Sequence, residues 1–178
     1  MIKILVLHRA IAITASPESR ACGSCSACCK THKVSDTRFV KEPGVWCQFC
    51  VKGQGCRIYE ERPSACKAFY CEWHKGAGEE KHRPDRTKVV LDFVSDPQGL
   101  PGGVLQMWEV TEGTLTQAYA KEVSLETLGY GIWVSHFYLS GRKRLFTPPS
   151  RLLTEEIIEV ATKEGIVFGT LHELEAAR

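Results

Sequence analysis

Apolar and polar positions alternate along much of the second half of the chain, as they do in half-buried strands. The alternation runs through KVVLDFV (88–94), VLQMWEV (104–110) and TLTQAYA (114–120). The turn TEG at 111–113 predicts that the second and third of these segments form a hairpin. GIWVSHFYL (131–139) and KRLFT (143–147) predict another hairpin across SGR. This half therefore reads as an antiparallel sheet.

The helical pattern near the end of the chain follows Pro148 and Pro149, which end the sheet. Thr154 begins the helix TEEIIEVATKEG, with two glutamates in its first turn and Gly165 past its end. A short strand, IVF, and a closing helix, HELEAAR, complete the chain. These elements predict an α+β fold, in which short helices pack on a small antiparallel sheet.

Aromatic side chains and one histidine lie inside the predicted strands. We expect Trp108, Trp133, Phe137 and Tyr138 to be core residues, and His136 to be a hydrogen-bonded core histidine rather than a catalytic one. The cysteine-free half has no dinucleotide-binding glycine motif, P-loop or nucleophile elbow. It identifies no substrate.

The first half of the chain shows less periodicity. Pro63 is suited to a first helical turn and predicts a helix from about Ser64 to Lys75, with Phe69 and Trp73 as core contacts. Residues 1–20 predict a tail or weak strand. His8 and Arg9 interrupt its apolar stretch, which is too short for an export signal or a membrane span. We therefore expect a cytoplasmic protein that does not enter a membrane.

Composition is that of an ordinary globular protein, with 43% hydrophobic and 25% charged residues. The 23 basic and 21 acidic side chains give a formal charge of +2. The nearest candidate for a basic stripe is RKR at 142–144, which is short and lies in a predicted turn. Nucleic-acid binding is therefore disfavoured.

All nine cysteines of the chain lie in its first half, and four of them fall within ten residues. They are Cys22, Cys25, Cys28, Cys29, Cys47, Cys50, Cys56, Cys66 and Cys71. A disulfide framework is disfavoured, because the number is odd, a bond between adjacent cysteines is strained, and no export signal is evident. We predict instead that the cysteines bind metal.

The spacing of the cysteines supports this prediction. Cys22/Cys25, Cys25/Cys28 and Cys47/Cys50 are CxxC pairs, in which a tight turn aims two sulfurs at one centre. Nine thiols could hold more than one metal ion. Two zinc tetrathiolates would use eight of them, and an iron–sulfur cluster would use four. The ferredoxin pattern fails at His32, where a further cysteine is expected, so zinc and iron both remain open.

Charge and helical geometry add two expectations. Basic residues between the cysteines could offset thiolate charge as a group; they are Lys30, Lys33, Arg57, Arg62 and Lys67. On the predicted helix, Cys66 and Cys71 would point roughly 140° apart, so an undistorted helix would not aim both at one metal. His74 shares a face with Cys71 but is better interpreted as a surface or packing residue.

The order of the cysteines resembles a known family. CGSCSACC at 22–29 has the spacing CxxCxxCC and is followed by Trp46-Cys47, GCRIYEERPSAC and a final Cys71. Residues 21–75 are similar to the YkgJ-like CxxCxxCC cysteine-cluster proteins, described as zinc- or iron-chelating domains. This resemblance implies a metal-binding protein without an assigned reaction. A related segment occurs in flagellin lysine methylases, where an iron–sulfur cluster is implied.

Carried over by position, eight cysteines match the family pattern and Cys50 does not. Cys50 is either a substitute ligand or a buried spare thiol. Asp36 falls where an acidic residue is expected, although a turn role in VSDT explains it equally well. The adjacent Cys28 and Cys29 either serve two metals, or one of them is a free thiol.

These observations define three regions and a provisional function. We expect a tail at 1–20, a cysteine-cluster region at 21–81, and at 82–178 a sheet with helices that forms one compact unit with the cluster. The predicted function is metal binding, with zinc or an iron(-sulfur) centre as cofactor and no protein partner identified. The alternatives are a metal-dependent enzyme or maturation factor and a zinc-ribbon-like interaction module, so enzyme activity stays open.

Overall fold

In this computed structural model the chain forms two units, which divide in sequence between Val90 and Leu91. The structure describes residues 20–95, 97 and 99–176. The predicted tail or weak strand lies outside the described residues except for its last residue, Arg20. No helix among the described residues has the length and apolar character needed to cross a membrane.

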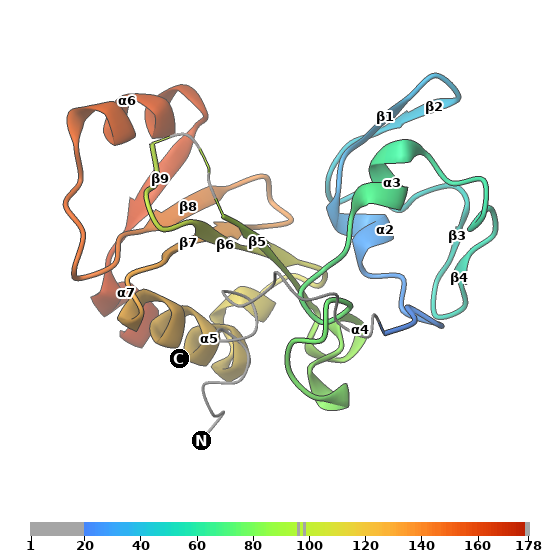
Figure 1. Ribbon diagram of the computed structural model, residues 1–178, viewed down its shortest axis with the longest axis horizontal. Helices are drawn as coiled ribbons and strands as arrows, with labels where there is room; N and C mark the ends of the chain where they lie inside the picture. Colours follow the sequence, from blue (N-terminus) through green and yellow to red (C-terminus); the bar gives the residue numbers. More distant parts are fainter. Residues whose placement is uncertain (1–19, 96, 98, 177–178) are drawn as a thin grey trace. The chain divides into compact units, whose positions relative to one another are not determined.

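The second unit is built on a five-stranded sheet with the order β5-β6-β7-β8-β9 (Figure 1). Its elements are β5 (Val89–Val94), β6 (Val104–Glu109), the 3-10 turn η2 (Thr114–Thr116), α5 (Ala118–Gly129), β7 (Trp133–Phe137), β8 (Lys143–Phe146), α6 (Glu155–Lys163), β9 (Ile166–Gly169) and α7 (Leu171–Ala176). Strand β5 begins at the last residues of the first unit. The combination of helices and sheet confirms a mixed α and β fold.

The sheet is mixed, so the expected antiparallel sheet is wrong. Strands β6 and β7 are parallel, with Val104 opposite Trp133, and β8 and β9 are parallel, with Leu145 opposite Phe168. Only the predicted hairpin of β7 and β8 is antiparallel among these three pairs. Each parallel pair is connected through a helix, as parallel strands require.

The predicted strand at 114–120, and with it the hairpin across 111–113, is also wrong. This segment forms η2 and the first turn of α5. The buried residues of α5 include Ala120, Val123, Thr127 and Leu128, which follow the helical period. Burial of this face outweighs the short alternation in TLTQAYA.

Helices cover both faces of the sheet. Figure 1 shows α5 and α7 on one side and α6 on the other. Parallel crossovers are right-handed, and β8 and β9 run opposite to β6 and β7, so the two crossover helices must lie on opposite faces. Val104, Trp133 and Leu145 pack with Ile157 of α6 on one face. The predicted strand at 166–168 and the helices at both ends of it are confirmed, with Thr154 accepting a hydrogen bond from Ile157 N–H as the N-cap.

The aromatic and histidine predictions hold in part. Trp133 and His136 are fully buried, as expected. Trp108 and Phe137 are half-buried and stack at 3.8 Å between ring centroids, and Tyr138 is half-buried beside them in sequence. His136 Nε2 lies 2.9 Å from the hydroxyl of Ser124, which confirms a hydrogen-bonded core histidine.

The first unit has short elements joined by long loops. They are α2 (Cys28–Thr31), β1 (Val34–Asp36), β2 (Phe39–Lys41), β3 (Cys50–Val51), β4 (Gly55–Cys56), α3 (Ser64–Ala68), the 3-10 turn η1 (Glu80–His82) and α4 (Pro84–Thr87). Strands β1 and β2 form one antiparallel hairpin, and β3 and β4 form another. The predicted helix at 64–75 ends at Ala68, because Phe69 is extended with φ −89° and ψ 124°. Cys66 and Cys71 therefore do not share a helix, and the helical angle between them does not apply.

The first unit has a small apolar core. Of the 23 buried apolar side chains among the described residues, six lie in the first unit, and two of these belong to β5. Trp73 is the largest of the six, as its predicted core role requires, and Phe69 is half-buried with its ring 3.9 Å from that of His32. Polar contacts must therefore supply much of the order in this unit.

Candidate metal centre

Seven of the nine cysteine side chains line a single cavity of about 280 Å³. They are Cys22, Cys25, Cys28, Cys29, Cys47, Cys56 and Cys66. All nine cysteines are free thiols of intermediate exposure. Residues up to 44 positions apart in sequence thus supply sulfur to one space. Cys50 and Cys71 are not part of its lining.

Two tight turns place the first four cysteines at the cavity. The Cys25 N–H donates to the Cys22 carbonyl at 3.0 Å, and the Cys29 N–H donates to the Ser26 carbonyl at 3.0 Å. Gly23 occupies the first turn with φ +53°, a conformation that glycine adopts without strain. The CxxC spacing therefore produces the turn that the sequence predicts.

Backbone N–H groups are aimed at three of the sulfurs. The Ala27 N–H donates to the Cys25 sulfur, and the Ile58 N–H donates to the Cys56 sulfur, in each case from two residues further on. The His74 N–H donates to the Cys71 sulfur. Such bonds stabilise a thiolate over a neutral thiol, and they are a feature of metal–thiolate sites.

Electrostatic interactions between the thiols define two groups. The first group is Cys22, Cys25 and Cys71, in which Cys71 interacts with both of the others. The second group is Cys29, Cys47, Cys56 and Cys66, in which Cys66 interacts with the other three. Cys50, outside the cavity lining, also interacts with Cys29 and Cys47 of this group. Cys22 also interacts with Cys29, so the two groups are neighbours. Cys28 adjoins Cys29 and is hydrogen-bonded to it.

The pKa of most of these thiols is raised by burial. Desolvation is the largest cause at Cys22, Cys25, Cys56 and Cys66, and it raises the pKa of Cys71 to about 11. At Cys29 the hydrogen bond from Cys28 is the largest cause, followed by burial, and the pKa is raised. A bound cation would reverse this preference, because metal coordination favours the thiolate.

Lys41 is a buried cation that interacts with three thiols of the second group, and sequence spacing did not single it out. Its side chain is buried in strand β2, and its ammonium group donates to the carbonyls of Lys30, Glu42 and Val45 at 3.0–3.2 Å. Burial lowers the pKa of Lys41, whereas the thiols of Cys47, Cys29, Cys66 and Cys28 act to raise it. The buried ammonium can offset thiolate charge directly.

Of the five basic residues expected to relieve charge, Arg62 has the clearest role. It lines the cavity, lies over the ring of Tyr59 at 3.8 Å and interacts with Cys22. The Tyr59 hydroxyl is hydrogen-bonded to the Cys22 thiol. Lys33 also lines the cavity and pairs with the exposed Glu42, whereas Lys30 lies over the ring of Trp46 at 5.8 Å.

The two non-cysteine candidates lie apart from the cavity lining. Asp36 ends β1 and accepts hydrogen bonds from the backbone N–H and Nε of Arg38, so its turn role is confirmed. His74 is buried with its ring 4.7 Å from that of Tyr70, which agrees with a packing role. Its contribution to the site is the backbone N–H that reaches Cys71.

Two arginines fix the segment after Cys71 beside the first cysteine turn. Arg20 donates four hydrogen bonds to the carbonyls of Trp73, Gly76, Ala77 and Gly78. A single side chain can donate four such bonds because the planar guanidinium group of arginine carries five N–H donors. Because Arg20 precedes Cys22 by two residues, these bonds hold the start of the cysteine turn near the loop that follows Cys71.

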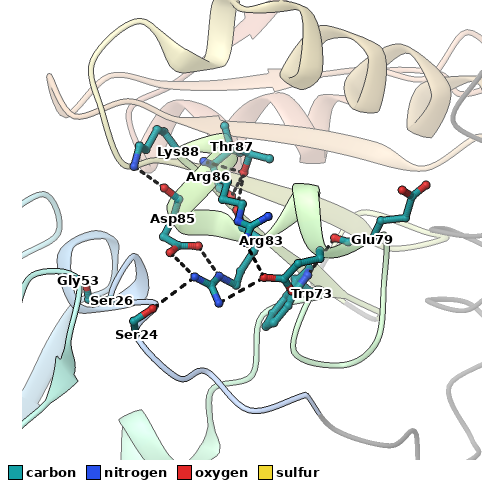
Figure 2. Close-up of polar contacts among 12 residues, drawn as sticks. Ser24, Ser26, Gly53, Trp73, Glu79, Arg83, Asp85, Arg86, Thr87 and Lys88 are labelled. Atoms are coloured by element: carbon teal, nitrogen blue, oxygen red, sulfur yellow. Dashed lines mark hydrogen bonds and ion pairs between the residues drawn. The ribbon is translucent and has the colours of Figure 1, made fainter.

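The second of these arginines, Arg83, links α4 to the same turn. Figure 2 shows its guanidinium between Asp85 and Ser24. It forms a paired contact with the Asp85 carboxylate at 2.6 and 2.8 Å and donates to the Ser24 hydroxyl at 3.3 Å. The Asp85 N–H in turn donates to the Cys25 sulfur. Arg83 therefore orients Asp85, whose N–H donates to the Cys25 sulfur.

The two units differ in formal charge. Residues 20–90 contain fourteen basic and eight acidic side chains, whereas residues 91–178 contain seven basic and twelve acidic ones. Residues 20–90 are thus at +6 and residues 91–178 at −5 when thiols and histidines are neutral. A surplus of positive charge among the residues that surround the thiols opposes the effect of burial and favours their ionised form.

The donor set fits a thiophilic metal in its chemistry. Cysteine sulfurs select zinc, copper(I) and iron–sulfur centres. Within residues 20–95, 97 and 99–176, no three histidine, cysteine, aspartate or glutamate side chains stand in the arrangement of a bound ion. The fit therefore rests on the number of sulfurs that share one cavity and on the N–H groups that point at them.

Comparison with protein-family models, with curated proteins and with solved structures gave no match for this chain. The resemblance to the CxxCxxCC proteins therefore rests on the cysteine pattern itself.

Proposed function

We propose that the chain is a metal-binding protein that holds zinc or iron through cysteine thiolates of its first unit. The observation that carries the proposal is the convergence of seven cysteine side chains on one cavity. The N–H···S bonds at Cys25, Cys56 and Cys71 support it, because they favour the ionised form of those sulfurs.

The proposed ligands follow the two thiol groups. Cys22, Cys25 and Cys71 would serve one centre, and Cys29, Cys47, Cys56 and Cys66 would serve the other. Cys28 adjoins both groups in sequence and supplies the remaining lining sulfur. Bound zinc would crosslink the loops, and bound iron would add redox chemistry.

The small apolar core supports a structural contribution from the metal. With six buried apolar side chains among residues 20–90, the first unit has little hydrophobic stabilisation of its own. Small domains of this kind use disulfides or metals to hold their loops. Since all nine thiols are free, metal–thiolate bonds are the available crosslink.

A second candidate function is a metal-dependent enzyme or maturation factor. The cavity volume favours it, because about 280 Å³ exceeds the space of one ion, and a water molecule takes about 30 Å³. Apolar side chains, including Val34, Phe39 and Phe69, complete the lining and could contact a substrate. A metal with an open coordination position would be required.

The test is elemental analysis with an absorption spectrum, on untagged protein purified without air. Zinc near two equivalents without visible absorption supports closed thiolate sites. Iron with inorganic sulfide and a broad visible band supports a cluster and favours the enzymatic candidate. Protein that is folded and holds less than a tenth of an equivalent of any transition metal, even after reconstitution, would overturn the proposal.

A further inference from the structure

His32 lines the same cavity as the seven cysteines and brings a nitrogen donor among their sulfurs. It also stands at a ligand position in the cysteine spacing. In the ferredoxin pattern a fourth cysteine follows CxxCxxC after three residues, and His32 occupies that place after Cys22, Cys25 and Cys28. Histidine replaces cysteine as a ligand in many structural zinc sites and in Rieske clusters. Both the residue type and its spacing therefore suit coordination.

Helix α2 places the His32 side chain one turn after the two adjacent cysteines. The helix covers Cys28–Thr31, and the His32 N–H donates to the Cys28 carbonyl at 3.3 Å, so the backbone is helical up to the His32 nitrogen. Residues three and four apart lie on the same side of a helix. His32 therefore shares one side of α2 with Cys28 and Cys29, and all three line the cavity.

Two contacts fix the orientation of the His32 imidazole ring. Nδ1 lies 2.8 Å from the hydroxyl of the buried Thr31, and the ring centroid lies 3.9 Å from that of Phe69. A histidine that binds metal commonly gives its second ring nitrogen to such a polar partner, which selects the tautomer and orients the ring. In the tautomer whose Nδ1–H donates to Thr31, the lone pair is on Nε2, and this atom is buried.

We propose that His32 Nε2 is a metal ligand that completes the first thiol group, giving a centre of three cysteines and one histidine. This role rests on the proposed function, because it names a further donor for the metal proposed there. Cys22, Cys25 and Cys71 supply three sulfurs, whereas a closed zinc site takes four donors. Among the donors that line the cavity, Cys28 and His32 belong to neither thiol group.

Cys28 is the competing fourth donor, and charge favours His32 over it. A zinc centre with four thiolates has a formal charge of −2, whereas one with three thiolates and a neutral imidazole has −1. The two centres are neighbours, so the lower charge reduces the repulsion between them. The ring of His32 is also held in place by Thr31 and Phe69 before any metal binds.

The test is histidine NMR of the full chain, labelled with nitrogen-15 and loaded with cadmium-113. Cadmium binds thiolates and imidazoles as zinc does, and its nuclear spin couples to a directly bonded nitrogen. We expect one histidine with a cadmium-coupled Nε2 and a protonated Nδ1. The coupled signals should be absent from His32→Gln and retained in His172→Gln, which changes an exposed histidine.

Metal content separates coordination from packing. His32→Phe keeps an aromatic ring against Phe69 but removes the donor, so zinc should fall from about two equivalents to about one. His32→Cys loses the ring but restores a donor at the same position, so it should retain both equivalents. Thr31→Val removes the partner of Nδ1 and should weaken zinc binding about 10- to 100-fold. A role in packing alone predicts the opposite order for the phenylalanine and cysteine variants.

Failure of this assignment differs from failure of the proposed function. Bound cadmium without a coupled histidine nitrogen would overturn the role of His32 and leave the metal-binding function standing. Zinc that is lost from Cys28→Ser and retained in His32→Phe would do the same and assign the fourth position to Cys28. Folded protein that binds neither zinc nor cadmium would reject the metal-binding function itself.

Discussion

A Cβ atom on Gly55 would lie 3.1 Å from the carbonyl oxygen of Gly23. Gly23 lies in the turn between Cys22 and Cys25, and Gly55 directly precedes Cys56. The absence of a side chain at Gly55 therefore lets two segments that line the cavity approach each other. This contact makes the backbone, as well as the sulfurs, part of the candidate site.

Replacement of Gly55 by alanine should lower metal content and stability together. Gly55 has φ +110°, so an alanine is strained there and also meets the Gly23 carbonyl. We expect a loss of about 2 kcal/mol in the free energy of unfolding. Gly53→Ala is the control, because φ is +73° and nothing lies within 4 Å of its Cβ position. Equal metal content in the two variants, measured by elemental analysis, would contradict this reading.

Lys41→Met should destabilise the first unit. The substitution leaves the carbonyls of Lys30, Glu42 and Val45 without the ammonium donor and removes a buried positive charge beside the thiols. A cost of about 3 kcal/mol is expected, with reduced metal content, measured by denaturant unfolding and elemental analysis. Lys67→Met, at an exposed position, should change the free energy of unfolding by less than about 0.5 kcal/mol.

Stability of the second unit should fall as pH drops below about 6.5. Burial lowers the pKa of His136 to about 3, so the folded state holds it neutral while the unfolded chain binds a proton. The contribution is fully present above the unfolded pKa and is lost as pH falls from 6.5 toward 3. Between pH 6.5 and 5.5 the expected loss is about 1 kcal/mol.

The pH effect can be assigned by substitution. His136→Gln keeps a polar group near Ser124 but removes the titration, so its stability should vary less with pH over this interval than that of the parent protein. His172→Gln, at an exposed position, should leave the pH dependence as it is. A parent-like pH slope in the His136 variant would assign the effect to other groups.

Removal of metal by a chelator should affect the two units unequally. Seventeen of the buried apolar side chains among the described residues belong to residues 91–178, whereas the first unit depends on polar contacts and, in our proposal, on metal. Limited trypsin digestion with and without chelator should show new cleavage at Lys30, Lys52 and Lys67. Fragments covering residues 91–178 should persist. Uniform protection of both units after chelation would argue against a structural metal.

Most elements of the second unit could be predicted from sequence. Its strands alternate apolar and polar residues, and the α6 helix buries one face and begins at a clear N-cap, Thr154. The strand at 114–120 was mispredicted since seven alternating residues overlap the start of a longer helical pattern through Val123 and Leu128. The helix α5 replaces the expected hairpin and connects β6 to the parallel strand β7. The helix α6 connects β8 to the parallel strand β9 in the same way, and these two crossovers make the sheet mixed.

The sulfur content of the site could be predicted, but the residues that support it could not. CxxC spacing produces turns by local geometry, so Cys22, Cys25 and Cys28 were identified directly. Lys41 and Tyr59 act through contacts made by segments distant in sequence, and nothing in their spacing indicates a role. The division into two thiol groups likewise depends on the loop after α3, which brings Cys71 to Cys22 and Cys25.

The low formal charge of the chain, +2, gives the protein a direct electrophoretic signature of its loading. A closed zinc tetrathiolate carries a formal charge of −2, so filling two such centres would take residues 20–90 from +6 to about +2 and the whole chain from +2 to about −2. Empty, half-filled and filled molecules would then migrate as a ladder of separate species in a native gel or on a cation exchanger. The occupancy of each preparation becomes countable by separation alone, without a spectroscopic label.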